Sequence, residues 1–388
     1  MGGDFKNQMT VIGAGDMGHG IAEVGLLCGL DVSLYDIKQE FLDRGVGKIK
    51  ESLTQMAAKG KIGEKDAQEM VRQRLHPSLD LAGAVGEAFW VIEAAPEILG
   101  LKKELFGKLD QLTRKEAILA SNTSNMSITQ LGAMTRKPDK VVGLHFFNPA
   151  VVMKLVEVIR GEKTSSETMQ LGYDLCLKMG KVPVRVEKDR PGFIVNRVQA
   201  PRGVLLGAIL DQGVAEPEEV DAKMKAIGMP MGPFELMDYV GIDVAYYSAL
   251  YRAEALHPDY APAKGVVEKV KAGRLGKKTG AGFYDWSKGR PQIDPAKATD
   301  KVDPLDFLLV TFNEATRAVE EGVATPADID LAIENGSGSK VGPIKQARGL
   351  DPKFLTERLE ALSRNFGKEI FRPTRTIREG LYRNWGSP

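Results

Sequence analysis

The chain has 388 residues, 43% of them hydrophobic, and its 53 basic and 52 acidic residues leave a formal net charge of +1. This length suits two or three domains with an ample core, and the balanced charge gives no general attraction to nucleic acid or anionic membranes. No apolar run reaches the roughly 20 residues of a membrane span, so we expect neither a nucleic-acid-binding nor a membrane protein.

The first predicted elements are a strand, a glycine-rich turn, a helix and a second strand. Residues 9–12 are typical of a short buried strand, GAGDMG at 13–18 leads into an apolar helix at 21–27, and the strand 31–36 ends in an acid. Such a unit binds a dinucleotide, because the glycines permit a tight turn and close backbone approach while the pyrophosphate meets the helix N-terminus. The residues expected to contact the cofactor are Gly13, Gly15, Asp16, Met17, Gly18 and Asp36.

Asp36 also predicts which dinucleotide binds. Its carboxylate would accept hydrogen bonds from the adenosine ribose and repel a 2′-phosphate. We therefore expect NAD rather than NADP as the cofactor. The first strand starts by about residue 9, which leaves no room for a targeting segment, so a cytoplasmic location is expected.

The cysteines and the remaining histidines are expected to have no chemical role. Cys28 and Cys176 lie in apolar helical patterns and are expected to be reduced core residues, and no Cys/His cluster of the metal-binding type occurs. His19 is expected near a helix start, and His76 and His257, which each precede proline, are expected in turns.

Strands and helices then alternate as far as about residue 187. Strands are predicted at 89–94, 117–120, 141–144, 155–159 and 181–187, with an amphipathic helix at 101–112, which indicates a doubly wound sheet. A helical segment at about 38–73 is more than a dinucleotide fold requires. It is either a solvated helical hairpin or an arm that clamps the remote part of a substrate.

A histidine and a carboxylate stand out within the later strands. His145 lies in GLHFFNP at 143–149, and Glu157 follows twelve positions later inside an apolar run, on the same strand face as Leu155. An ionised carboxylate there is costly without a compensating charge. An imidazole that becomes positive while removing a proton would supply that charge. Taken alone, the two segments could also be a His-Pro turn and a strand-edge Glu that reaches water.

Helical periodicity replaces the strand pattern after a hinge at DRPG, residues 189–192. The helical part repeats itself, since GVAEP at 213–217 recurs as GVATP at 322–326. The prediction is a Rossmann-type α/β domain at 1–188, with the arm at about 38–73, followed by an all-α domain made of two repeats, 189–292 and 293–388.

Taken together, the motifs resemble the 3-hydroxyacyl-CoA dehydrogenase family over nearly the whole chain. Besides the glycine turn and the histidine segment, SNTS at 121–124, PGFIVNR at 191–197 and MGPFEL at 231–236 carry the resemblance. It implies reversible, NAD-dependent oxidation of the 3-hydroxyl of an L-3-hydroxyacyl-CoA. The second repeat is that of longer fused relatives, and since no hydratase-sized segment remains, hydration is not expected.

The resemblance also implies roles for individual residues. His145 corresponds to the catalytic base and Glu157 to its orienting partner, while Ser124 would contact substrate and cofactor and Asn196 would orient the substrate. Further family positions lie near the nicotinamide and its ribose (Glu97, Lys102, Asn148) and against coenzyme A (Ser52, Lys59).

Several of these residues have alternative interpretations. Ser124 could cap a helix that begins near Ser127, and Asn196 could cap its own helix or form a bond across the domain interface. The remaining alternatives are a solvated helix start for Glu97 and Lys102, and a solvent-facing side chain for Lys59. Two other functions stay open at this point: a dehydrogenase of a free hydroxy acid or sugar acid, and a non-catalytic NAD-binding structural protein.

The second repeat bears on assembly. In the short enzymes of the family, the single helical domain makes the dimer contact. We expect the second repeat to cover the same apolar face within the chain, which would give a monomer or a weak homodimer. The expected partner is an acyl-CoA thioester substrate.

Overall fold

The computed structural model describes residues 7–385, which form two compact units. The first, the sheet unit, runs to Val195 and includes Gly322–Gly342; the second, the helical unit, holds Asn196–Glu321 and the chain from Pro343 onward. Within the described residues, no helix is long and apolar enough to cross a bilayer. A cytoplasmic location stays a prediction.

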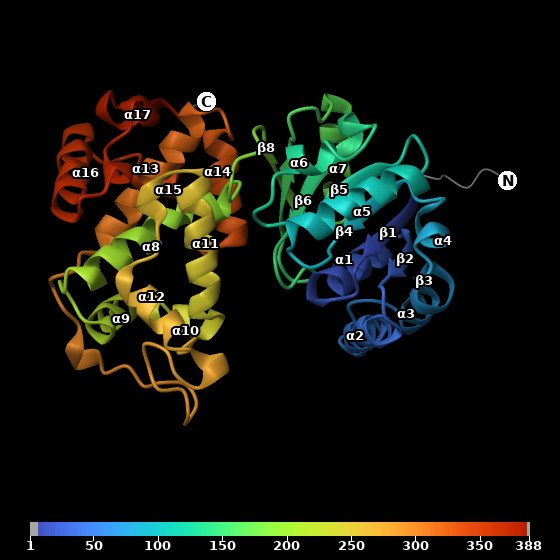
Figure 1. Cartoon of the computed structure of the whole chain (residues 1–388), viewed down its shortest axis with the longest axis horizontal. Helices are drawn as coiled ribbons and strands as arrows, with labels where there is room; N and C mark the ends of the chain where they lie inside the picture. Colours follow the sequence, from blue (N-terminus) through green and yellow to red (C-terminus); the bar gives the residue numbers. More distant parts are fainter. Residues whose placement is uncertain (1–6, 386–388) are drawn as a thin grey trace. The chain divides into compact units, whose positions relative to one another are not determined.

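The described strands of the sheet unit form one eight-stranded sheet (Figure 1). Its spatial order is β3 (Leu75–Ser78), β2 (Asp31–Tyr35), β1 (Gln8–Ile12), β4 (Trp90–Glu93), β5 (Ile118–Ser121), β6 (Val141–Phe146), β7 (Leu155–Ile159) and β8 (Val182–Val186). Neighbouring strands are parallel except for β6 and β7, which run antiparallel. The short connection at 147–154 explains this exception, because parallel neighbours need a crossover of a dozen residues or more.

Helices cover the sheet. In chain order the sheet unit contains α1 (Asp16–Leu27), α2 (Gln39–Ala58), α3 (Glu64–Glu69), the π-helix η2 (Met70–Arg74), α4 (Leu81–Val85), α5 (Leu99–Leu112), α6 (Ile128–Gly132), the 3-10 helix η3 (Pro138–Lys140), α7 (Ser166–Lys178) and α14 (Pro326–Gly336). The predicted arm corresponds to α2, α3 and η2.

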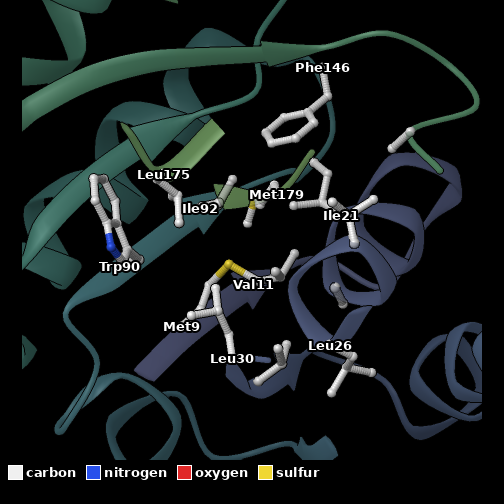
Figure 2. Close-up of a cluster of buried hydrophobic side chains, with 14 of the residues drawn as sticks. Met9, Val11, Ile21, Leu26, Leu30, Trp90, Ile92, Phe146, Leu175 and Met179 are labelled. Carbon is white, nitrogen blue, oxygen red and sulfur yellow. The ribbon is translucent and has the colours of Figure 1, made fainter. Parts of the chain in front are cut away.

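The core of the sheet unit explains which strand residues point to which face. Apolar side chains from α1, α7 and alternate strand positions make one cluster, which includes Met9, Ile21 and Phe146 (Figure 2). Leu144 and Val156 also belong to this cluster. Because successive strand side chains point to opposite faces, the alternate positions on β6 and β7, which include His145 and Glu157, face the other side of the sheet.

Two expectations about single residues have different outcomes. Both cysteines are free thiols, as predicted, and Cys176 is a fully buried core residue, whereas Cys28 is only half-buried against the core. The predicted turn at His76 is wrong, since His76 lies in β3 and pairs with Ser33. This strand lies at the edge of the sheet, where a proline such as Pro77 is tolerated because its missing N–H faces no partner strand.

The helical unit contains only helices and isolated bridges among its described residues. Its elements are α8 (Val195–Asp211), α9 (Pro217–Ala226), α10 (Pro233–Val240), α11 (Ile242–Ala255), η4 (Pro258–Tyr260), α12 (Lys264–Lys271), η5 (Lys277–Thr279), η6 (Pro295–Lys297), α13 (Pro304–Glu320), α15 (Pro343–Ala347), α16 (Pro352–Phe366), η7 (Glu369–Phe371), α17 (Arg375–Arg378) and η8 (Leu381–Asn384). Many of these helices begin with proline, whose fixed φ suits the first helical position. The predicted fold class, an α/β domain followed by an all-α part, is confirmed.

The segment 322–342 departs from the predicted boundaries. Although it belongs to the second sequence repeat, its helix α14 packs on β7 and β8 of the sheet unit. Glu187 N–H at the end of β8 donates to Val323 O at 2.7 Å, and Gly336 lies so close to Leu155 that a Cβ there would be 2.4 Å from that side chain. The three predicted domains stay a prediction, since a compact unit and a sequence repeat need not share boundaries.

Candidate active site

The glycine turn between β1 and α1 is shaped for close backbone approach. Gly13 has φ +97°, and a Cβ on it would lie 2.7 Å from Ala94 O. At Gly18 a Cβ would lie 1.7 Å from Gly13 O, whereas nothing lies within 4 Å of a Cβ placed on Gly15. There is therefore no room for a side chain at Gly13 or Gly18, whereas the space beside Gly15 is open. At Gly15 the N-terminus of α1 presents backbone N–H groups of the kind that bind pyrophosphates.

A cavity of about 570 Å³ opens beside this turn, and Gly13, Gly15, Asp16, Met17 and Asp36 line it. Asp36 directly follows β2, which ends at Tyr35, and its carboxylate accepts the N–H of Ala14 (2.8 Å) and of Ile37 (2.7 Å). These two bonds fix the carboxylate beside the turn. The open glycine, the helix N-terminus and the fixed acid together fit a dinucleotide with an unphosphorylated ribose.

Asp16 and Lys48 form an exposed ion pair at the start of α1. Lys48 Nζ lies 2.7 Å from Asp16 Oδ1, and the hydrogen bond from Lys48 lowers the pKa of that carboxyl. The carboxylate also faces the positive end of the α1 dipole. Its local partners are thus a lysine and a helix end, and a direct cofactor contact by Asp16 stays a prediction.

His145 and Glu157 are cross-strand partners in the antiparallel pair of β6 and β7. His145 Nδ1 lies 2.7 Å from Glu157 Oε2, and the two side chains are 8% and 0% exposed. A carboxylate only accepts hydrogen bonds, so Nδ1 carries the hydrogen, and in the neutral imidazole Nε2 then keeps a lone pair. The rings of Phe147 and Phe193 lie 4.5 and 5.8 Å from the imidazole. The predicted pair is therefore present, buried and oriented.

The second oxygen of Glu157 is held by backbone that the sequence did not reveal. Oε1 accepts the N–H groups of Ile194 (3.0 Å) and Val195 (2.9 Å). The chain turns toward it at Gly192 and Phe193, where Phe193 has φ +51° and is fully buried. A non-glycine residue in this region costs about 1–3 kcal/mol. Both carboxylate oxygens are thus satisfied, which compensates for burying the charge.

Ser124 lies in the loop after β5, at the carboxyl ends of the parallel strands β5 and β6, and His145 is the last but one residue of β6. Its N–H donates to Glu97 Oε1 (3.1 Å), and Thr123 Oγ1 donates to the same oxygen (2.5 Å). The side chain that caps α6 is that of Ser127, which accepts the N–H of Gln130, so Ser124 is not needed as a cap. Glu97 is an acceptor for this loop rather than a fully solvated side chain.

Lys102 is buried in a polar cluster under the same loop. Its Nζ lies 2.5 Å from Glu93 Oε1, 3.1 Å from Ala95 O and 3.3 Å from Glu97 Oε2, so each of its three donors has an acceptor in the protein. Ser121 Oγ donates to the other Glu93 oxygen at 2.6 Å. The alternative of a solvated helix start is wrong for Lys102, which is 1% exposed. Glu93 was not predicted as part of the site. Its position at the end of an apolar strand could have indicated it, because a buried acid needs a partner.

The predicted coenzyme A residues lie on the arm. Ser52 Oγ donates to Glu23 Oε1 at 2.5 Å, and burial raises the pKa of Glu23. Lys59 is exposed at the C-terminus of α2. A groove of about 610 Å³ between α2 and α3 is lined instead by residues that include Lys50, Thr54 and Arg72. Neither predicted residue lines it.

Two predicted asparagines remain. Asn148 is exposed just beyond β6. Asn196 belongs to the helical unit, in the first turn of α8. Their roles stay predictions.

Comparison with known proteins places this geometry in a family. The model of the 3-hydroxyacyl-CoA dehydrogenase NAD-binding domain matches residues 8–190, and that of the C-terminal domain of the same family matches twice, at 192–286 and 307–383. The chain belongs to the 3-hydroxyacyl-CoA dehydrogenase family. The two C-terminal matches agree with the internal repeat and identify the long form with a duplicated helical part.

Individual relatives carry related names. The chain is 33% identical to 3-hydroxyadipyl-CoA dehydrogenase of Escherichia coli K12, over 96% of both proteins, and 44% identical to a probable 3-hydroxybutyryl-CoA dehydrogenase of Deinococcus radiodurans, over 72% of this chain and 100% of that protein. A fatty acid oxidation complex subunit alpha of Psychrobacter is 39% identical over 86% of this chain, which spans about half of that protein. The crystal structure of 3-hydroxybutyryl-CoA dehydrogenase from Escherichia coli K12 superposes with a TM-score of 0.88 at 32% identity, covering 96% of this chain and 98% of that one.

Membership in the 3-hydroxyacyl-CoA dehydrogenase family confirms the predicted class of activity and its cofactor. The protein is an oxidoreductase of the hydroxyacyl-CoA dehydrogenase type, and the cofactor of its N-terminal domain is NAD. An acyl-CoA substrate is consistent with the family.

Proposed function

We propose that this protein oxidises an L-3-hydroxyacyl-CoA to the 3-ketoacyl-CoA, reversibly, with His145 as the general base. The observation that carries the proposal is the buried hydrogen bond from His145 Nδ1 to Glu157 Oε2 at 2.7 Å, which leaves Nε2 free to take the hydroxyl proton. When bound, NAD supplies the hydride acceptor for carbon 3. In the reverse direction the imidazolium returns the proton to the ketone oxygen.

Glu157 stabilises the imidazolium formed in that step. Because it is fully buried and held by two backbone N–H groups, the carboxylate needs little reorganisation when the positive charge appears. Ser124 and Asn196 would bind the substrate oxygen and orient the carbon that loses hydride. The loop position of Ser124 supports this role, since open α/β sheets bind ligands at the carboxyl ends of their strands.

His145→Gln tests the base directly. We expect kcat for acetoacetyl-CoA reduction by NADH to fall at least about a hundredfold, while NADH affinity, measured by fluorescence titration, stays unchanged. A matched control is His257→Gln, which changes the N-cap of η4 in the helical unit. Near-normal turnover of the His145 variant would rule out the proposed base.

The thioester requirement separates this function from the oxidation of a free hydroxy acid or sugar acid. We expect acetoacetyl-CoA to be reduced far faster than acetoacetate, and Lys59→Gln to raise KM for the thioester with little change in kcat, because Lys59 is proposed to pair with a coenzyme A phosphate. Equal rates for both substrates would favour the free acid. A chain-length series of 3-ketoacyl-CoA substrates would then measure the depth of the acyl site.

We also propose that the protein is a monomer or a weak homodimer. In support, Arg197 of α8 is 2% exposed and donates to Glu314 of α13 at 2.8 Å and to Glu321 at 2.9 Å. Thus a buried charge of the first repeat is neutralised by the second repeat of the same chain. Sedimentation at micromolar concentration tests this proposal, and a tight dimer that buries residues 196–250 would refute it.

A further inference from the structure

The helical unit contains a cavity of about 280 Å³ between α8, α10, α11 and the segment 260–266. Its wall is built largely from small apolar residues, among them Ala200, Val204, Ala208, Ala249 and Val266, together with the ring of Phe234. Cavities of this kind take ligands whose bodies are apolar and whose orientation is fixed by a few polar groups.

One polar group of the wall stands out. Arg252, on α11, lines the cavity, and its Nε is buried without a hydrogen-bond acceptor among the described residues. Burial lowers the pKa of Arg252, yet an arginine stays charged in proteins. A buried, charged donor without an acceptor is costly, and a ligand that brings an anionic acceptor would remove the cost.

The other polar groups of the wall favour an anion as well. Lys264 and Lys368 line the same cavity. Its one acid, Asp211, already accepts the N–H groups of Lys264 (2.8 Å) and Gly265 (3.1 Å) at the start of α12. Tyr260 is 4% exposed, and its hydroxyl is protonated at neutral pH and can donate; burial raises its pKa further.

We propose that this cavity binds a small apolar carboxylate, with the carboxylate on Arg252 and the hydrocarbon among the alanines of α8 and α11. A straight-chain fatty acid of about six to eight carbons suits the volume, since roughly 30 Å³ is needed for each water-sized group. A coenzyme A thioester is far larger than the cavity. The proposal is independent of the catalytic roles assigned to His145 and Glu157.

Calorimetry with octanoate and with neutral 1-octanol tests the role of the charge, using the full-length protein at pH 7. We expect saturable binding of one octanoate per chain and at least tenfold weaker binding of octanol. Arg252→Gln should weaken octanoate binding tenfold or more and leave octanol binding unchanged. Arg364→Gln, which removes an exposed arginine paired with Glu360 on α16, is the matched control and should bind octanoate as the wild type does.

Ala249→Leu tests the cavity itself, because it fills the space and keeps Arg252. We expect it to abolish binding of both compounds while the melting temperature and NADH affinity remain those of a folded protein. The proposal is overturned if the wild type shows no saturable octanoate binding, if Arg252→Gln binds octanoate as well as the wild type, or if binding survives in Ala249→Leu.

Discussion

Replacing Glu157 by Gln separates the charge of this residue from its hydrogen bonds. The amide oxygen can still accept the N–H groups of Ile194 and Val195, but the amide nitrogen would face His145 Nδ1 as a donor. The imidazole must then accept at Nδ1 and carry its hydrogen on Nε2. In that tautomer Nε2 has no lone pair for the hydroxyl proton.

The size of the effect follows from the same geometry. Unit charges about 4 Å apart interact by about 4 kcal/mol at the effective dielectric constant of a protein site, and each 1.36 kcal/mol is a factor of ten in rate. We therefore expect kcat for the oxidation of L-3-hydroxybutyryl-CoA by NAD to fall about a thousandfold, with NADH affinity unchanged. Unfolding in urea should show a loss of only about 1–2 kcal/mol, because all three hydrogen-bonding positions remain filled.

Glu157→Ala is the contrasting variant. It leaves two buried N–H groups and the imidazole without acceptors, so we expect a loss of stability of several kcal/mol in addition to the loss of turnover. If Glu157→Gln kept more than about a tenth of wild-type kcat, the carboxylate would be a structural residue and the reasoning from charge and tautomer would be refuted.

Three further changes have defined outcomes. Lys102→Met leaves Glu93 buried without its cation, so the free energy of unfolding in urea should fall by about 3–5 kcal/mol. Burial raises the pKa of Asp221 from 3.8 to about 6, so the free energy of unfolding should fall as this carboxyl ionises between about pH 4 and pH 6. In urea titrations at several pH values, Asp221→Asn should remove up to about 3 kcal/mol of this pH dependence. Asp36→Ser should reduce the preference for NADH over NADPH in kcat/KM about tenfold or more, because the anion that repels a 2′-phosphate is gone.

Each outcome has a control. Combining Lys102→Met with Glu93→Gln should restore most of the lost stability, and failure to do so would show that packing rather than charge is responsible. A pH dependence that is unchanged in Asp221→Asn would assign it to other groups. If Asp36→Ser reduced kcat/KM equally with NADH and with NADPH, the carboxylate would stabilise the glycine turn through its bonds to Ala14 and Ile37 and would not select the cofactor.

The local patterns of the N-terminal half predicted its sheet well, because parallel strands buried on both faces are apolar runs that few other structures produce. The strand β3 was not predicted because its sequence, LHPS at 75–78, is not an apolar run. It is short, lies at the edge of the sheet and contains a proline. The antiparallel pairing of His145 with Glu157 could have been predicted from the sequence, because the predicted strands 141–144 and 155–159 are joined by fewer residues than a parallel crossover needs.

Contacts between segments that are distant in the sequence could not be predicted from such local patterns. The N–H groups of Ile194 and Val195 reach Glu157 only because Phe193 adopts a left-handed backbone, which its sequence does not favour. The partners of Lys102 likewise depend on how the loop after β4 folds back over the helix. The packing of α14 on β7 and β8 is set by tertiary contacts that the repeat pattern conceals, since the repeat groups this segment with the helices.

The return of residues 322–342 to the sheet unit has a consequence for synthesis of the chain. A ribosome that has released only the first 195 residues has made all eight strands of the described sheet, yet β7 and β8 still lack the helix α14 that packs on them. The sheet is covered only after α14 has been synthesised, about 140 residues later, because this helix ends at Gly336. For the same reason, one protease cut in the segment between the two repeats would not liberate an intact nucleotide-binding fragment, because the late segment remains on the other piece.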